Sequence, residues 1–291
     1  MIEVGHLLEA TDPPAVGLEV LRLADLRRRY TGRPLARPLR APCHVLMLIN
    51  AGRGRHGIDF VQHDCRPSTL LWGRPGQVHQ FNADPGLDAI VLCFSADLLP
   101  PAGGPLGYLL DDPFAPTGWL PTGEDEEAII TEVTQLATDT ERHAAGDGVP
   151  AELLRHQLAV LLVRVAALAR PGARVGDGLP ARGPDDLLAR LHRELAAASP
   201  ATRRVADHAA RLGVSVRTLT RACLATTGRG AKQIVDAWIA LEAKRLLACT
   251  DGSVAAIGRG LGFSEPTNFG RFFARETGVT PGEFRALLST G

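Results

Sequence analysis

The sequence carries no net charge and no long hydrophobic run. Its 291 residues include 32 basic and 32 acidic side chains, a balance that taken alone argues against binding to nucleic acid. No stretch of about 20 apolar residues is present, so no transmembrane helix is expected. The first thirty residues contain acidic side chains, such as Glu3, Asp12 and Asp25, and no apolar run. We therefore expect no secretion signal and a cytoplasmic protein.

Closely spaced cysteine pairs and the common catalytic motifs are also missing. The cysteines are scattered, so we expect reduced, buried thiols, with a redox-sensing pair among the three N-terminal cysteines as the alternative. Gly-x-Ser-x-Gly, the phosphate-binding Gly-x-x-x-x-Gly-Lys and His-Glu-x-x-His do not occur. We therefore predict no enzyme and no cofactor. The five cysteines are Cys43, Cys65, Cys93, Cys223 and Cys249.

A short motif occurs twice near the C-terminal end of the sequence. Leu-Gly-x-Ser stands at residues 212–215 and again at 261–264, and a Thr-Gly pair follows each copy, at residues 227–228 and 277–278. The Leu-Gly pairs lie 49 residues apart and the Thr-Gly pairs lie 50 apart. This near-constant period predicts one supersecondary unit that is used twice.

The first copy predicts a helix, a short turn and a second helix over residues 203–228. The apolar residues between 205 and 212 fall on one helical face, and Gly213 suits a left-handed helix end. Ser215 suits the N-cap of the next helix. This is helix-turn-helix geometry, in which the second helix can enter the major groove of DNA.

The second copy repeats this pattern over residues 253–278. Ser264 is its predicted N-cap, and Pro266 stands in the first helical turn, where a missing N–H costs little. Gly258 and Gly260 lie inside its first helix and are each less favourable than Ala by roughly 1 kcal/mol, so we expect this copy to be the softer one. Residues 232–248, between the copies, predict one long helix, and residues 280–283 predict the capping box of a closing helix.

Polar side chains on the outer faces of the two second helices are the predicted DNA contacts. Arg can bind guanine and Asn adenine through two hydrogen bonds each, whereas other side chains of such helices hold phosphates. Residues 185–291 contain 15 basic and 10 acidic side chains, which leaves 17 and 22 for residues 1–184, so the basic charge lies in this region. The predicted contacts are Arg217, Thr218, Thr220, Arg221, Glu265, Thr267, Asn268, Arg271 and Arg275.

These motifs resemble the DNA-binding domain of the AraC/XylS family of transcription regulators. The similarity is densest at residues 241–247, 261–269 and 271–281. The resemblance implies two helix-turn-helix units joined by a linker helix. Trp238 on that linker helix stands where many members carry Arg.

The N-terminal half has a different pattern, in which short apolar strands alternate with Gly and Pro turns. Gly76-x-x-His79 resembles the second motif of cupin barrels and, with Gly54-x-His56 upstream, the cupin-like sensor half of the same family. Because His56 alone would fill the first motif of catalytic cupins, we predict no metal site. The strands of this predicted small barrel or sandwich are residues 45–49, 56–61, 69–72, 74–81 and 89–94.

A small-molecule pocket is predicted in this barrel, mostly apolar with a few polar groups. For His79, a hydrogen-bonded turn position is the alternative to ligand contact, and the aromatic residues are equally compatible with plain core. The effector itself is not predicted. The predicted pocket residues are Met47, Phe60, Trp72, His79 and Phe81.

Two helices are predicted after the barrel, at residues 123–141 and 150–169. The second has an apolar face wide enough to cover the barrel and to offer a seam to a second copy of the chain. Dimerisation through such helices is what the family resemblance implies, and packing within one subunit is the alternative. The residues predicted at the dimer seam are Leu154, Leu158, Leu161, Leu162 and Val165.

These parts predict an α+β chain. A cupin-like sensing and dimerisation domain is expected over residues 1–169, a flexible Gly/Pro-rich linker over 170–184, and the DNA-binding domain over 185–291. The expected function is a homodimeric transcription regulator that couples a small-molecule effector to binding of double-stranded DNA, with RNA polymerase as a further partner. The alternatives are a cupin-type metal enzyme carrying a DNA-binding module, and an architectural DNA binder without an effector.

Overall fold

The computed structural model describes residues 17–29, 38–81, 86–98, 104–111, 114–168 and 184–289. The chain forms two compact domains whose described residues share no hydrophobic core. The N-terminal domain comprises His6–Leu110 and Ala115–Gly178, and the C-terminal domain consists mainly of Leu179–Gly291. The predicted linker at residues 170–184 lies, except for Pro184, outside the described residues. Among the described residues, no helix is both long and apolar enough to cross a membrane.

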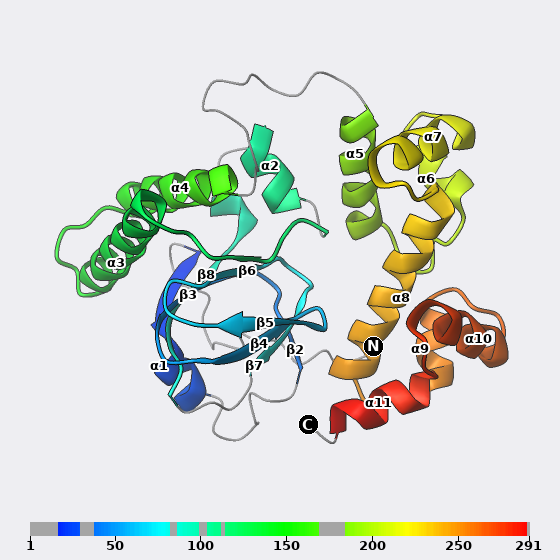
Figure 1. Cartoon of the computed structure of the whole chain (residues 1–291), viewed down its shortest axis with the longest axis horizontal. Helices are drawn as coiled ribbons and strands as arrows, with labels where there is room; N and C mark the ends of the chain where they lie inside the picture. Colours follow the sequence, from blue (N-terminus) through cyan, green and yellow to red (C-terminus); the bar gives the residue numbers. More distant parts are fainter. Residues whose placement is uncertain are drawn as a thin grey trace. The chain divides into compact units, whose positions relative to one another are not determined.

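Two antiparallel sheets form the frame of the N-terminal domain (Figure 1). The larger sheet has the order β1-β8-β3-β6-β9, and the smaller one has the order β2-β7-β4-β5. The strands of the larger sheet are β1 (Leu18–Arg22), β8 (Asp88–Phe94), β3 (His44–Ala51), β6 (Leu70–Gly73) and β9 (Gly118–Trp119). Those of the smaller sheet are β2 (Leu39–Arg40), β7 (Val78–Phe81), β4 (Gly54–Ile58) and β5 (Val61–Cys65).

The single strand predicted for residues 56–61 is wrong, because the chain reverses there. Asp59 and Phe60 both have positive φ, 48° and 68°, and they join β4 to β5 as a hairpin. The Asp59 carboxylate accepts hydrogen bonds from the Val78 backbone N–H at 3.0 Å and from Gln77 Nε2 at 2.8 Å. These bonds stabilise a turn that Asp tolerates better than a β-branched residue would.

Alternation along the central strand β3 divides the N-terminal domain into two cores. Val45, Met47 and Ile49 point between the two sheets, together with side chains from β2, β4, β6, β7 and β8. Leu46 and Leu48 point to the other face, where the larger sheet packs against helices. Because successive strand residues face opposite sides, each β3 residue serves only one of the two cores.

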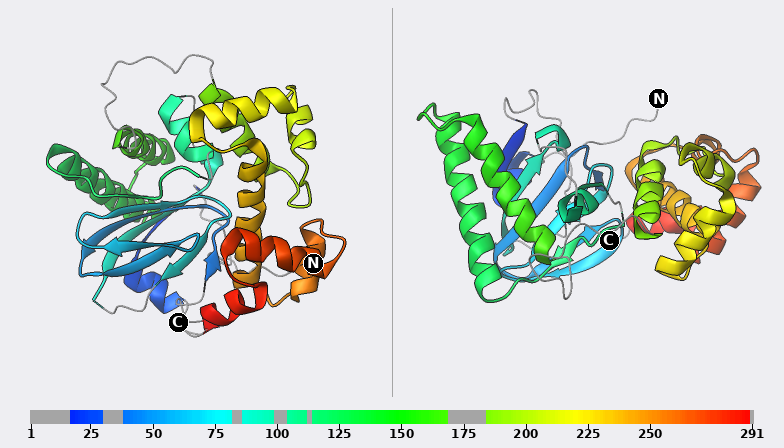
Figure 2. Two further views of the ribbon diagram at one scale, coloured as in Figure 1. Left: turned by 45° about the vertical axis from the view of Figure 1, so that its right-hand side comes forward. Right: turned by 90° about the horizontal axis from the view of Figure 1, so that it is seen from above.

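Helices cover the outer face of the larger sheet. Helices α3 (Glu124–Ala144) and α4 (Ala151–Leu168) lie side by side there (Figures 1 and 2), as the sequence predicted. Gln157 Nε2 on α4 donates to Asp139 on α3 at 2.7 Å, and Arg164 pairs with Glu132 at 3.3 Å. The smaller helices of this domain are α1 (Leu23–Arg29), the 3-10 turn η1 (Ala96–Leu98) and α2 (Gly104–Asp111).

The described secondary structure of the C-terminal domain consists of helices joined by turns. Its two helix-turn-helix units are α6-α7 and α9-α10. The long helix α8 joins them, as predicted for residues 232–248, and its Ile234, Val235 and Ile239 belong to the shared core. The helices are α5 (Pro184–Ala197), α6 (Val205–Arg211), α7 (Val216–Thr227), α8 (Ala231–Cys249), α9 (Val254–Gly260), α10 (Pro266–Thr277) and α11 (Pro281–Ser289).

The predicted helix ends hold in the first helix-turn-helix and need one correction in the second. Gly213 follows α6 with φ 69°, and Ser215 caps α7 by accepting from the Thr218 N–H at 3.1 Å. Before α10, however, Glu265 occupies the N-cap position and Pro266 the first helical position, so Ser264 is not the cap. Pro266 adopts the expected position because its fixed φ suits the first turn.

Candidate DNA interface and effector pocket

The second helix of the first helix-turn-helix, α7, exposes two arginines. Arg217 and Arg221 are one turn apart and both exposed, whereas Leu219 and Cys223 on the opposite face are fully buried. Thr218 and Thr220 are half-buried, and the Thr218 hydroxyl lies 2.9 Å from Ser215 Oγ at the cap. Val216 and Leu224 are 43% and 49% exposed on the same helix, so apolar groups share this surface with the polar ones.

The corresponding helix α10 exposes Thr267, Asn268 and Arg271, while Phe269, Phe272 and Phe273 anchor it in the core. Glu265 is exposed at the N-cap position. This is the face that the sequence predicts for contact with bases.

Arg275, at the end of α10, is held by acidic neighbours. Its Nη2 lies 3.3 Å from Asp236 on α8 and 2.8 Å from Glu276. Asp236 also pairs with Lys232, so one buried carboxylate ties two surface cations together. Arg275 is therefore placed differently from Arg271, which has no such acidic partner among the described residues.

A pocket of about 500 Å³ lies beside α10 and contains an arginine from outside the second helix-turn-helix. The guanidinium carbon of Arg203, just before α6, lies 3.4 Å from the centre of the Phe263 ring, and its Nη1 donates to the Gly262 carbonyl at 3.2 Å. A Cβ on Gly262 would lie 2.7 Å from the Ala201 carbonyl oxygen. The segment ahead of α6 thus packs closely on the turn between α9 and α10.

The five residues predicted to line an effector pocket do not form one group, although the rings of His79 and Phe81 lie 6.2 Å apart. Trp72 belongs to the core beneath the helices, where its Nε1 donates to His44 Nδ1 at 3.3 Å. Met47 and Phe81 lie in the other core, between the sheets, and Phe60 is in the β4-β5 turn. The prediction of one pocket from these residues is corrected, because Trp72 and Met47 point to opposite faces of the same sheet.

His79 is fully buried between the sheets. Its Nδ1 lies 3.1 Å from His56 Nε2, and a Cβ on Gly73 would be only 2.1 Å from its Nε2. Burial lowers the pKa of His79 to about 4 and that of His56 well below its usual range. Both rings are therefore neutral at physiological pH, and His79 spans the two sheets as part of the interior.

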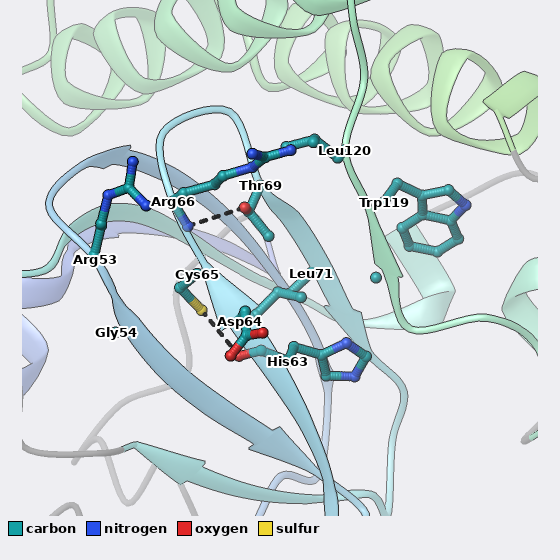
Figure 3. A pocket seen from close by; sticks show the side chains of 11 residues that line it. Arg53, Gly54, His63, Asp64, Cys65, Arg66, Thr69, Leu71, Trp119 and Leu120 are labelled. Carbon is teal, nitrogen blue, oxygen red and sulfur yellow. Dashed lines mark hydrogen bonds between the residues drawn. The ribbon is translucent and has the colours of Figure 1, made fainter.

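A pocket of about 630 Å³ opens where the two sheets end (Figure 3). It lies between β5, the last strand of the smaller sheet, and β9, the last strand of the larger one. Figure 3 shows Trp119 across the opening from Arg53, with His63 and Leu71 between them. The lining residues are Arg53, Gly54, His63, Asp64, Cys65, Arg66, Thr69, Leu71, Gly118, Trp119 and Leu120.

The floor of this edge pocket is built from specific contacts. His63 Nε2 lies 2.9 Å from the Thr117 hydroxyl, which links β5 to the segment that enters β9. A Cβ on Gly118 would lie 2.7 Å from His63 Nδ1, so only glycine leaves room for this ring. Burial lowers the pKa of His63 and raises the pKa of the Cys65 thiol to about 11, so both groups are neutral.

Sequence reasoning missed the edge pocket because its residues come from separate strands. Arg53 and Arg66 flank the hairpin that His63 belongs to, while Trp119 follows more than fifty residues later. The available signal was two arginines bracketing a β-hairpin, which alone is typical of a solvated turn. Strand pairing, which the sequence does not specify, brings the two edges together.

The residues predicted at the dimer seam are buried inside the N-terminal domain. Leu154, Leu158, Leu161, Leu162 and Val165 are at most 1% exposed and belong to the core that α4 shares with the larger sheet. That assignment is corrected, since side chains without exposed surface cannot contact a second chain. The exposed apolar side chains of α3 and α4 are instead Ile130, Leu153, Val160 and Val163.

Two of the N-terminal cysteines are neighbours. A side-chain hydrogen bond with Cys93 lowers the pKa of the half-buried Cys43 thiol, against the opposing effect of burial. Cys65 lies elsewhere, at the edge pocket. The redox-sensing alternative therefore concerns Cys43 and Cys93, and it stays a prediction.

Comparison with known proteins assigns the two domains. The AraC-like ligand binding domain matches residues 27–159, and a helix-turn-helix domain matches residues 208–287. The arabinose operon regulatory protein of Salmonella typhimurium is 28% identical over 258 residues, which cover 86% of each chain. A ligand-binding domain joined to a DNA-binding one defines a transcription regulator. This chain belongs to the AraC family of such regulators.

Two solved structures show partial similarity to this chain. ToxT from Vibrio cholerae is 11% identical, with a TM-score of 0.44 and coverage of 94% of this chain and 99% of that one. An AraC-type regulator from Chromobacterium violaceum is 26% identical, with a TM-score of 0.32 and coverage of 36% of this chain and 96% of that one.

Proposed function

We propose that this regulator reads two successive major-groove segments of its operator with α7 and α10, and that an effector in the N-terminal domain changes that binding. The observation that carries the proposal is the matching outer face of the two helices. Each exposes side chains able to make paired hydrogen bonds to bases, while its opposite face is locked into one common core.

The nine predicted contacts divide into two groups by their surroundings. Arg217, Arg221, Asn268 and Arg271 are exposed, and we assign them, with Thr267, to base contact. Arg275 is held by Asp236, so we assign it to a phosphate, as a group that positions the protein without reading sequence. Thr218 and Thr220, in the first half of α7, are assigned to the same positioning role, whereas the Glu265 carboxylate can only accept a hydrogen bond from a base and joins the first group.

The proposal extends to the assembly and its location. We propose a cytoplasmic homodimer that contacts RNA polymerase at the promoter and performs no catalytic step. The exposed apolar residues of α4, Leu153, Val160 and Val163, support a contact with a second copy. They replace the buried leucines as the residues expected at that contact.

Alanine substitution tests the reading of bases. Operator DNA is first selected from a random library with the full-length protein, and Arg217, Arg221, Asn268 and Arg271 are then replaced singly. Each loss of a paired contact should cost ~1–3 kcal/mol on the selected site and relax the preference at one position only. Arg275→Ala should weaken binding to all sequences alike and reduce its salt dependence.

Arg193 provides the control, since it is exposed on α5, outside both reading helices. Arg193→Ala should leave the selected sequence preference unchanged. The assignment would be wrong if none of the four substitutions altered the preference. Binding without any selected sequence would instead favour the architectural alternative.

A further inference from the structure

The edge pocket differs from the interior of the N-terminal domain in two ways. It contains empty volume, and it is lined by charged side chains that have no ion-pair partner among the described residues. The space between the sheets is filled by side chains such as Met47, Ile49 and Val91, which are at most 1% exposed. The edge pocket has about 630 Å³, a volume within the range of small-molecule sites. It also lies where two edge strands end, a place that proteins usually cover or pair.

Two guanidinium groups stand at this pocket without partners. Neither Arg53 nor Arg66 makes a side-chain hydrogen bond or ion pair within the described part of the chain, and both are exposed. The one acidic lining residue is Asp64, and burial keeps His63 neutral, so the lining carries a net positive charge. An arginine fork matches a carboxylate better than it matches a neutral group.

The opposite wall of the pocket is apolar. Leu71 and Leu120, which is 40% exposed, line it, whereas the indole of Trp119 lies with Leu70 on the face of the larger sheet that packs against the helices. An apolar body can pack on these two leucines, Leu71 and Leu120, while its acidic group reaches the guanidinium groups. The His63–Thr117 contact fixes the floor between these two walls.

We propose that the edge pocket binds a small organic carboxylate, with the carboxylate held by Arg53 and Arg66 and an apolar ring or short chain packed on Leu71 and Leu120. The role of this molecule as the effector rests on the proposed function, whereas its binding does not.

The pocket is also connected to the helical layer of the same domain. Trp119 and Leu120 lead through Pro121 into α3, and the hydroxyl of Ser68, beside the lining residue Thr69, hydrogen-bonds to Glu126 in the first turn of α3. A ligand that joins β5 to β9 therefore restrains the start of α3. The helix pair α3-α4 is the route by which occupancy reaches the proposed dimer contact.

Calorimetric titration of the full-length protein tests the binding, with benzoate as the probe and benzamide as its uncharged counterpart. Benzoate should bind with millimolar or better affinity, and benzamide should bind at least about tenfold more weakly, because it cannot form a charge-assisted bond. Arg53→Gln and Arg66→Gln should each weaken benzoate binding about tenfold or more. Leu120→Ala should weaken benzoate and benzamide alike.

Arg55 offers a matched control, since it lies on β4 two residues from Arg53, is exposed and does not line the pocket. Arg55→Gln should bind benzoate like the wild type, and circular dichroism verifies that every variant is folded. Equal affinity for benzoate and benzamide, benzoate binding unaffected by both arginine substitutions, or no benzoate binding at millimolar concentration would each overturn the proposal. None of these measurements involves DNA, so they are independent of the reading assigned to α7 and α10.

Discussion

Three buried histidines of the N-terminal domain are kept neutral by their surroundings. Burial, with a contribution from nearby Arg74, lowers the pKa of His44 to about 3, and burial lowers that of His79 to about 4. Burial and the neighbouring His79 and His63 hold the pKa of His56 well below its usual value. Neutral His44 is needed as the acceptor for Trp72 Nε1.

These histidines should make the protein less stable in acid. The unfolded chain binds protons near pH 6.5, whereas the folded one does so only near pH 3 to 4 for His44 and His79. The stability that they contribute is therefore complete above pH 6.5 and is lost as the pH falls from there toward 4, by up to about 1.4 kcal/mol per pH unit for each histidine. Urea denaturation of the full-length protein from pH 7.5 to 4.5 measures this slope.

His44→Gln keeps a hydrogen-bond acceptor for Trp72 Nε1. It should reduce the pH dependence of the free energy of unfolding by at most the contribution of one histidine. His156 is exposed on α4, so His156→Gln should leave the slope unchanged. A stability that did not vary over this range would mean that the buried rings accept protons without cost.

For single residues, the sequence predicts helix ends and caps better than it predicts on which face of a sheet a side chain lies. Gly213 and Ser215 could be assigned because a left-handed helix end and an N-cap depend on neighbouring backbone alone. The position of Trp72 could not be assigned, because the face of the sheet on which its side chain lies depends on strand register. Leu46 is the partner of Trp72 and Met47 that of Leu71, so Trp72 shares a face with Leu46 and turns away from Met47.

Between elements, a glycine of the second helix-turn-helix has a packing role. A Cβ on Gly258 would lie 2.9 Å from the Phe269 ring, because α9 and α10 approach closely at this point. Gly260, two residues on, has nothing within 4 Å of such an atom. The expectation that both glycines only lower the stability of the second helix-turn-helix therefore fits Gly260 alone.

Gly258→Ala should destabilise the protein by about 1–3 kcal/mol, since Phe269 is fully buried and has to shift. Gly260→Ala should be neutral or stabilising by up to about 1 kcal/mol, through helix propensity. Urea unfolding gives both values, and operator binding shows whether α10 keeps its position. Equal effects of the two substitutions would contradict the packing argument.

Helix α4 illustrates what periodicity leaves undecided. Its limits were predicted closely because an apolar helical pattern and Pro150 define them. Its apolar residues nearly surround the helix, however, and the larger sheet takes the side with Leu158 and Leu162. The side of α4 that stays exposed, and could contact the proposed second copy, depends on packing between elements that are distant in sequence.

For the whole molecule, the separate core of the C-terminal domain predicts an independent DNA binder. A fragment of residues 185–291 should fold and bind the selected operator alone, because its core consists of its own helices. It should bind roughly a hundredfold more weakly than the full-length chain, since a dimer raises the effective concentration of the second reader. Fluorescence anisotropy on a two-site operator measures both affinities.

A full-length variant with Val160→Asp and Val163→Asp provides the comparison, because both side chains are exposed and apolar. It should bind like the fragment and sediment as a monomer. Equal affinity of fragment and full-length chain on two sites would argue against the homodimer.

The packing of Arg203 on Gly262 and Phe263 has a consequence for the sites that this protein can recognise. Together with α8, that contact is expected to hold α7 and α10 at a fixed separation and rotation. Each base pair inserted between the two contacted segments turns the second one by about a tenth of a helical turn. Insertions there should therefore be more damaging than substitutions, and the site of each monomer should be one ungapped pattern of constant length.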